Sequence, residues 1–193
     1  MTENAVDAVR SIFEHTIRSH EQFASTRLDS VVAAADAINR AVETGRTIIA
    51  FGNGGSAGDA QHLAGELIGR FEAERRPLAA VALSPDSSVV TAIANDYGYE
   101  QVFARQLEAL GRTGDVAIGI STSGRSKNVE LALAGAKARG LVTIALTGRD
   151  GGPMGEAADI HINVAESSTA RIQEVHRTIL HAICSLVERR LAS

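Results

Sequence analysis

A histidine and a glutamate lie four residues apart, at His62 and Glu66, shortly after a glycine-rich stretch. Residues at this spacing share one face of a helix, so both side chains are expected to point into one site. The preceding residues 52–57 read Gly-Asn-Gly-Gly-Ser-Ala and follow the apolar run 47–51. Glycines permit a tight turn and close approach to a ligand, and a helix that begins there points free N–H groups at an anion. This glycine loop, residues 52–57, therefore suggests an enzyme that acts on a small phosphorylated molecule.

A second candidate site follows the apolar run 115–120, before a helix expected from about residue 127. Four hydroxyl residues gather there around one glycine: Ser121, Thr122, Ser123 and Ser126. We call residues 121–126 the hydroxyl loop. Hydroxyls at a helix N-terminus, with its free N–H groups and favourable dipole, suit a phosphate, whereas a capping role for Ser126 explains only one of the four. Because loops at the carboxyl ends of parallel strands meet at one crevice, we expect both loops to line one pocket.

The glycine loop has two other interpretations. It fits the dinucleotide fingerprint G-x-G-x-x-A, with Glu72 about twenty residues further on as the ribose-binding acid. That match is weak, because Glu72 belongs to a charged run, residues 71–76, which we interpret as a solvated helix end rather than the tip of a second strand. The remaining alternative is a tight turn that binds no ligand.

The last predicted helix carries three more candidates, Gln173, His176 and His181. His176 and His181 cannot share a face, because five residues correspond to about 140° out of register. Gln173 and His181 are separated by about 80° of rotation and about 12 Å along the axis. Both reach one site only when they lean inward or when a neighbouring subunit contributes. Spacing alone therefore identifies no site on this helix.

Strands and helices alternate from residue 46 onward, which predicts an α/β fold. Short apolar runs predict five strands, at 47–51, 79–83, 115–120, 142–146 and 160–164. Periodic apolar residues predict helices at 57–70, 87–94, 99–110, 127–139 and 169–191, with a loop at Gly151-Gly152-Pro153. Continuous apolar strands are typical of a parallel sheet with helices on both faces. We therefore predict a three-layer, doubly wound, five-stranded parallel sheet.

Two further helices precede the first strand, at 5–25 and 28–44, each with an apolar stripe. We predict one domain over residues 1–193, with a helical hairpin at 1–45 that leads into an α/β core at 46–193. The apolar faces of the hairpin cover either this domain or a neighbouring subunit, and the pattern does not say which.

Composition narrows the class of protein. The 193 residues have a net charge of −4 with acids and bases interspersed, so no basic surface for nucleic acid or an anionic membrane is expected. A single cysteine, Cys184, excludes an internal disulfide and fits a reducing compartment. No apolar stretch approaches the roughly 20 residues of a membrane span, and the first residues do not read as a signal peptide. We expect a cytoplasmic protein.

Motifs along most of the chain resemble those of the phosphoheptose isomerases, a family of sugar isomerase (SIS) domains. The matching motifs are 52–57, 59–62, 94–99, 120–126, 146–148 with 150–152, and 171–174. The resemblance implies a flavodoxin-like five-stranded parallel sheet and a homotetramer with active sites at subunit interfaces. It implies the conversion of D-sedoheptulose 7-phosphate to D-glycero-D-manno-heptose 7-phosphate, an early step towards surface-polysaccharide heptose.

The resemblance also assigns roles to matching residues. Phosphate binding falls to Ser121, Thr122, Ser123 and Ser126. Contacts with the sugar fall to Asn53, Gly54, Gly55, Ser56, Glu66, Asn95, Asp96 and Gln173. One zinc ion per subunit is expected on His62, Glu66, Gln173 and His181, and Glu66 with His181 forms the acid/base pair. The glycine loop then shapes the sugar end of the pocket, and the hydroxyl loop binds the phosphate.

Two functional alternatives stay open. Non-catalytic SIS proteins that bind the replication initiator DnaA share the glycine and serine loops but lack the glutamate and the final histidine, both present here as Glu66 and His181. An isomerase for another sugar phosphate is the second alternative. Some family members carry an acidic residue just before Arg-Ile-Gln, where this chain has Thr169-Ala170, so the resemblance leads us to expect one sugar contact fewer.

Overall fold

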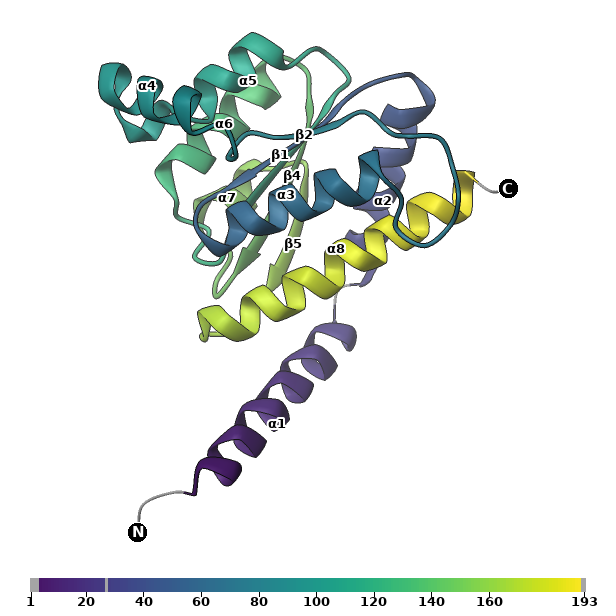
Figure 1. Ribbon diagram of the computed structural model, residues 1–193, viewed down its shortest axis with the longest axis vertical. Coiled ribbons are helices and arrows are strands. Elements are labelled where there is room, and N and C mark those ends of the chain that lie inside the picture. The colour runs from purple at the N-terminus through teal and green to yellow at the C-terminus, as the bar shows by residue number, and fades with distance from the viewer. Residues whose placement is uncertain (1–3, 27, 192–193) are drawn as a thin grey trace.

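Five parallel strands form the centre of the computed structural model, which describes residues 4–26 and 28–191 (Figure 1). In chain order the strands are β1 (Ile48–Gly52), β2 (Ala80–Ala82), β3 (Val116–Ser121), β4 (Val142–Gly148) and β5 (Ile160–Val164). Their order across the sheet is β2-β1-β3-β4-β5, which is the flavodoxin-like arrangement. Every residue of β1 and β3 is buried, as the continuous apolar runs predict. The predicted five-stranded parallel sheet is confirmed.

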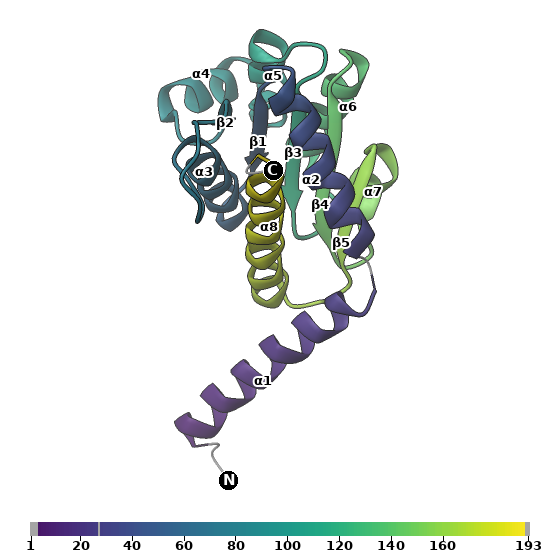
Figure 2. The ribbon, with the colours of Figure 1, turned by 90° about the vertical axis from the view of Figure 1, so that its right-hand side faces the viewer.

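Helices cover both faces of this sheet (Figure 2). In chain order the helices are α1 (Ala5–Ala24), α2 (Leu28–Glu43), α3 (Gly55–Ile68), α4 (Ser87–Tyr97), η1 (Tyr99–Gln101), α5 (Ala104–Leu110), α6 (Lys127–Ala138), α7 (Gly152–Ala157) and α8 (Thr169–Leu191). Apolar residues of α2, α3 and α8 form one core with the sheet, and those of α5, α6 and α7 form a second core on its other face. The two cores give the predicted three layers.

Two local predictions are wrong. The expected helix 99–110 is interrupted: η1 ends at Gln101, and α5 begins at Ala104. The expected loop at Gly151-Gly152-Pro153 instead begins α7. Proline suits the first turn of a helix, because its missing N–H would have no partner there and its φ is already helical. Gly151, with φ of 87°, makes the turn into this helix.

The predicted helical hairpin is corrected as well. Figure 1 shows that α1 does not fold back along α2 but extends away from the body of the molecule. Only Ser19 and Phe23 of this helix are buried, near its C-terminal end. Its apolar stripe is exposed: Val6 by 61%, Val9 by 52%, Phe13 by 65% and Ile17 by 56%. No helix in the described part of the chain is both long and apolar enough to cross a membrane.

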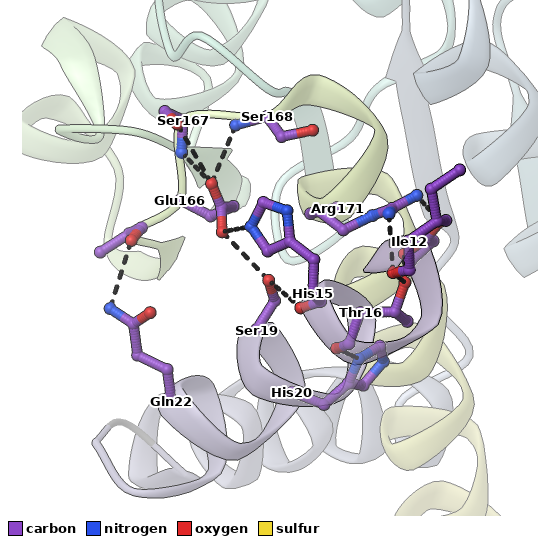
Figure 3. A network of polar contacts seen from close by, with 12 residues as sticks. Ile12, His15, Thr16, Ser19, His20, Gln22, Glu166, Ser167, Ser168 and Arg171 are labelled. Carbon is purple, nitrogen blue, oxygen red and sulfur yellow. Dashed lines mark hydrogen bonds and ion pairs between the residues drawn. The ribbon is translucent and has the colours of Figure 1, made fainter. Parts of the chain in front are cut away.

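Polar contacts hold the later half of α1 against the segment before α8 (Figure 3). The Glu166 carboxylate accepts hydrogen bonds from His15 Nε2 (2.9 Å), Ser19 Oγ (3.0 Å) and the Ser168 N–H (3.0 Å). These donors, Ser168 foremost, outweigh the effect of burial and lower the pKa of Glu166 to about 2. His20 hydrogen-bonds Thr178 of α8 at 2.9 Å. These partners of His15 and His20 lie 151 and 158 residues away in the chain, which is why spacing does not predict them.

Candidate active site

Two helices bring together His62, Glu66 and His181, which we call the His/Glu cluster. His62 and Glu66 lie one turn apart on α3, with His62 Nε2 3.2 Å from Glu66 Oε1. His181 comes from α8, and its Nε2 lies 2.8 Å from Nε2 of His62. One ligand atom from each of the three residues fits within a mutual distance of 4.8 Å. The predicted shared face of His62 and Glu66 is confirmed, and tertiary packing adds His181.

The surroundings of the cluster lower the pKa of His62 and so favour its neutral form. Burial is the largest effect that lowers the pKa of His62, followed by the positive charge of Arg177, while Glu66 opposes them. Arg177 itself lies 2.7 Å from the buried carboxylate of Asp59, whose pKa is raised mainly by burial. A neutral imidazole can accept a proton or bind a metal ion. Two imidazoles and a carboxylate are also the donor types that zinc prefers, so the residues fit the predicted metal.

Gln173, on α8, directs its side chain to the first residue of α3. Its side chain packs on Gly55, where an added Cβ would meet Gln173 Nε2 at 2.3 Å. Together with Asp59 and Arg177 it lines a hollow of about 590 Å³. His62 and Glu66 lie two and three turns further along α3. Gly55 therefore gives this amide its space, and a metal-binding role for Gln173 stays a prediction.

The glycine loop is fixed by side chains from two other elements. Asn53 and Asn128 exchange hydrogen bonds through their carboxamides, each 2.9 Å long. The Tyr99 hydroxyl donates a further hydrogen bond to Asn53 Oδ1 at 3.0 Å. Gly54 has φ of 55° and ψ of −121°, a conformation that favours glycine, and α3 begins at the next residue. Sequence reasoning missed Asn128 and the role of Tyr99, although Tyr99 lies within the matching motif 94–99.

The hydroxyl loop gathers its side chains in one place. Ser121 Oγ lies 2.9 Å from Ser126 Oγ and 3.3 Å from Ser123 Oγ. Ser126 is the residue before α6, yet its side chain makes no capping hydrogen bond to that helix. The capping alternative for Ser126 is therefore wrong, and its hydroxyl faces the other serines. Thr122 is half-buried in the same loop. Phosphate binding by these four residues stays a prediction.

Both loops leave the sheet at the same edge. β1 ends at Gly52 and β3 at Ser121, and these neighbouring strands pair in parallel with Gly52 opposite Ile120. In a sheet of this order, the position between β1 and β3 is the topological switch point, where ligands bind. The Asn53–Asn128 pair joins the glycine loop to α6 at this point. The structure thus confirms that the two loops are neighbours.

The remaining predicted sugar contacts lie around this edge. Ser56, in the first turn of α3, is buried. Asn95 and Asp96 are exposed at the end of α4, where Asn95 Nδ2 donates to Asp96 Oδ1 at 2.8 Å. The hydrogen bond from Tyr99 to Asn53 attaches the segment that follows α4 to the glycine loop. The sugar-binding roles of Ser56, Asn95 and Asp96 stay predictions.

Comparisons with known proteins identify the family of this chain. A family model described as a SIS domain matches residues 13–148. A phosphoheptose isomerase from Geotalea daltonii is 53% identical over 161 residues, which cover 83% of this chain and 84% of that relative. The chain belongs to the phosphoheptose isomerase family. Another phosphoheptose isomerase, from Halorhodospira halophila, is 47% identical over 188 residues, 96% of this chain and 95% of that relative.

A solved phosphoheptose isomerase shares the fold. The structure of GmhA from Neisseria gonorrhoeae matches with a TM-score of 0.92 and 43% identity, over 96% of this chain and all of that one. The similarity therefore includes α1 and α8 as well as the sheet. Both the resemblance and the fold that it implies are confirmed.

Proposed function

We propose that this chain interconverts D-sedoheptulose 7-phosphate and D-glycero-D-manno-heptose 7-phosphate. Family membership supports this reaction class. The observation that carries the proposal is the His/Glu cluster, in which a carboxylate and two imidazoles lie within proton-transfer distance of one another. Moving a carbonyl from C2 to C1 requires removal of a proton from C1, stabilisation of an enediolate and return of a proton to C2.

In this mechanism Glu66 is the carbon base and His181 its partner. The Glu66 carboxylate removes the C1 proton and delivers it to C2, while His181 moves a proton between the two oxygens. The 2.8 Å contact between His181 Nε2 and His62 Nε2 requires one ring to donate and the other to accept. The neutral state favoured for His62 allows it to hold His181 in one tautomer.

We further propose one zinc ion per subunit, held by His62, Glu66 and His181 with Gln173. When bound, the ion would act as a Lewis acid towards the sugar oxygens. His62 and His181 supply imidazole nitrogens, and Glu66 supplies a carboxylate oxygen.

The substrate is oriented by the two loops at the sheet edge. Ser121, Thr122, Ser123 and Ser126, with the N-terminus of α6, bind the phosphate. The sugar lies along the glycine loop, at Asn53, Gly54, Gly55 and Ser56, with Asn95 and Asp96 beside it. The phosphate is thereby held at one end of the pocket and the reacting carbons at the other, which is the orientation that proton transfer requires.

A homotetramer is the assembly that we propose. Exposed apolar residues form a continuous stripe on α1, at Val9, Phe13 and Ile17. A stripe of this kind, unlike single surface apolar residues, suits contact with a second copy of the chain. Light scattering would measure the oligomer, and Phe13→Asp, which charges this stripe, should yield smaller species. A wild-type monomer would contradict the assembly.

The reaction is tested by incubating the purified chain with sedoheptulose 7-phosphate and then reducing the sugars with borodeuteride. Fragmentation in the mass spectrometer locates the deuterium at C1 for the aldose phosphate and at C2 for the ketose phosphate. Formation of the heptose phosphate supports the proposal. Tight binding of DnaA without turnover would replace it with the non-catalytic alternative. Turnover of a shorter ketose phosphate in preference to the heptulose would identify a different sugar-phosphate isomerase.

A further inference from the structure

Glu188 is a buried acid on the same helix as His181. It lies seven residues after His181 on α8, close to the same face, and is only 5% exposed. Its carboxylate accepts hydrogen bonds from the backbone N–H groups of Phe71 (2.8 Å), Glu72 (2.9 Å) and Ala73 (2.8 Å). The three donors belong to the segment that follows α3. Glu188 therefore attaches that segment to α8.

Arg75 forms a buried ion pair with Glu188. Its Nε donates to Glu188 Oε1 at 3.1 Å, and the two side chains are 7% and 5% exposed. Its terminal nitrogens donate to the carbonyl oxygens of Glu66 (2.6 Å) and Leu67 (2.8 Å). These carbonyls belong to the last turn of α3 and lack partners within the helix. Arg75 therefore holds the end of α3 through the backbone of Glu66 itself.

The segment between these contacts also reaches His181. The Phe71 ring lies 5.3 Å from the His181 ring, centroid to centroid. Since the N–H of Phe71 is bound by Glu188, the position of this ring depends on the same carboxylate. The Arg75–Glu188 pair thus contacts the backbone of Glu66 through Arg75 and the backbone of Phe71, whose ring lies beside His181, through Glu188.

We propose that Arg75 and Glu188 form a positioning bridge that sets the placement of Glu66 relative to His181. Neither side chain touches the substrate in this proposal, which rests on the proposed isomerase function. A role in stability alone does not require charges here, because well-packed apolar residues often replace a buried ion pair at no cost. The hydrogen bonds end on the backbone of one reacting residue and on the segment beside the other, so the pair connects the two reacting groups.

The first test is Glu188→Gln, with Glu43→Gln as a matched control. Glu43 pairs with Arg190 at 2.8 Å, but both side chains are about half exposed. Because a small misplacement of reacting groups costs much in rate, Glu188→Gln should lower kcat about tenfold. KM should stay within about twofold, since the bridge contacts neither loop that orients the substrate. The control should change neither constant. Unchanged kcat in folded Glu188→Gln would overturn the proposal.

A second measurement is independent of turnover. In proton–carbon NMR spectra of the folded protein, the ring current of Phe71 contributes to the shift of the His181 Cε1–Hε1 signal. Glu188→Gln should move this signal although Phe71 is still present, and Glu43→Gln should not. If the wild type is inactive but the His181 signal moves in Glu188→Gln, the positioning role of the bridge is supported and the proposed isomerase function is contradicted. If the wild type is active and neither kcat nor the signal changes, the bridge fails.

A third variant removes the risk that Glu188→Gln does not fold. Phe71→Leu leaves the Arg75–Glu188 pair and all backbone contacts in place and removes only the ring beside His181. It should lower kcat about threefold to tenfold with little change in KM. Arg75→Lys keeps the charge but lacks the planar fork that reaches the carbonyls of Glu66 and Leu67, and it should behave like Glu188→Gln. Wild-type kcat in Phe71→Leu and Arg75→Lys together would contradict the bridge.

Discussion

The two ends of the candidate active site are built in different ways. The hydroxyl loop lies within one strand–loop–helix unit, and its serines contact one another over only a few residues of chain. The His/Glu cluster joins α3 to α8 across 119 residues. The serine and threonine side chains of the hydroxyl loop are neutral, whereas the two helices of the cluster also carry the buried acids Asp59 and Glu188 and the partly exposed Arg177. The proposed phosphate site is thus locally encoded, but the proposed proton-transfer site depends on how two helices pack.

The largest expected effect is the loss of kcat in Glu66→Gln, which tests the His/Glu cluster and not the hydroxyl loop. Glu66→Gln removes the proposed carbon base, and kcat should fall by about a thousandfold, within the range typical of general base catalysis. Exchange of solvent deuterium into the substrate carbon, followed by NMR, should vanish. The exposed Glu156→Gln is the control and should behave like the wild type. Continued exchange in Glu66→Gln would show that another base acts and that the cluster is not the proton-transfer end.

Metal removal should affect only the cluster end. Chelation should lower kcat at least tenfold, because the ion would polarise the sugar oxygens, and added zinc should restore it. The inhibition constant of inorganic phosphate should not change, since the hydroxyl loop contains no predicted metal ligand. Elemental analysis checks that the metal has left. Full activity of the metal-free protein would contradict a catalytic metal at the cluster. Weaker inhibition by phosphate would show that the metal also contributes to phosphate binding.

Ser126→Ala probes the hydroxyl end. Loss of a hydrogen bond to a charged group costs about 1.5 kcal/mol or more, so KM should rise about tenfold while kcat changes little. Thermal stability should stay close to that of the wild type, because Ser126 makes no capping hydrogen bond to α6. The exposed Ser88→Ala is the matched control. An unchanged KM would remove Ser126 from the phosphate site.

The smallest effect is expected from Tyr99→Phe. It removes one hydrogen bond to Asn53 Oδ1, worth about 1 kcal/mol, while the pair with Asn128 remains. KM should rise by about fivefold or less. Tyr97→Phe is the control, since Tyr97 is similarly exposed and its ring, which stacks under Arg105, is retained. If kcat falls by a larger factor than KM rises, Tyr99 acts on the proton-transfer step and not on substrate binding.

Sequence patterns predict this molecule well where contacts are local. The strands and most helices follow from apolar periodicity, and the four hydroxyls around Gly124 are found at one place because the chain itself brings them there. The same reasoning places His62 and Glu66 on one face of α3, since helix geometry alone decides that. The hydroxyl loop and two of the three residues of the His/Glu cluster are thus predictable without tertiary structure.

Contacts between distant elements are different, because periodicity does not say which faces meet. Spacing alone identifies no site at His181, yet the packing of α8 on α3 brings it to His62. Arg75 and Glu72 look like a solvated helix end in the sequence, but tertiary structure buries Arg75 against Glu188. The direction of α1 is decided by Glu166 and Thr178, far away in the chain. The sequence by itself determined the secondary-structure elements and the hydroxyl loop, and only tertiary packing decided where His181 meets His62 and Glu66.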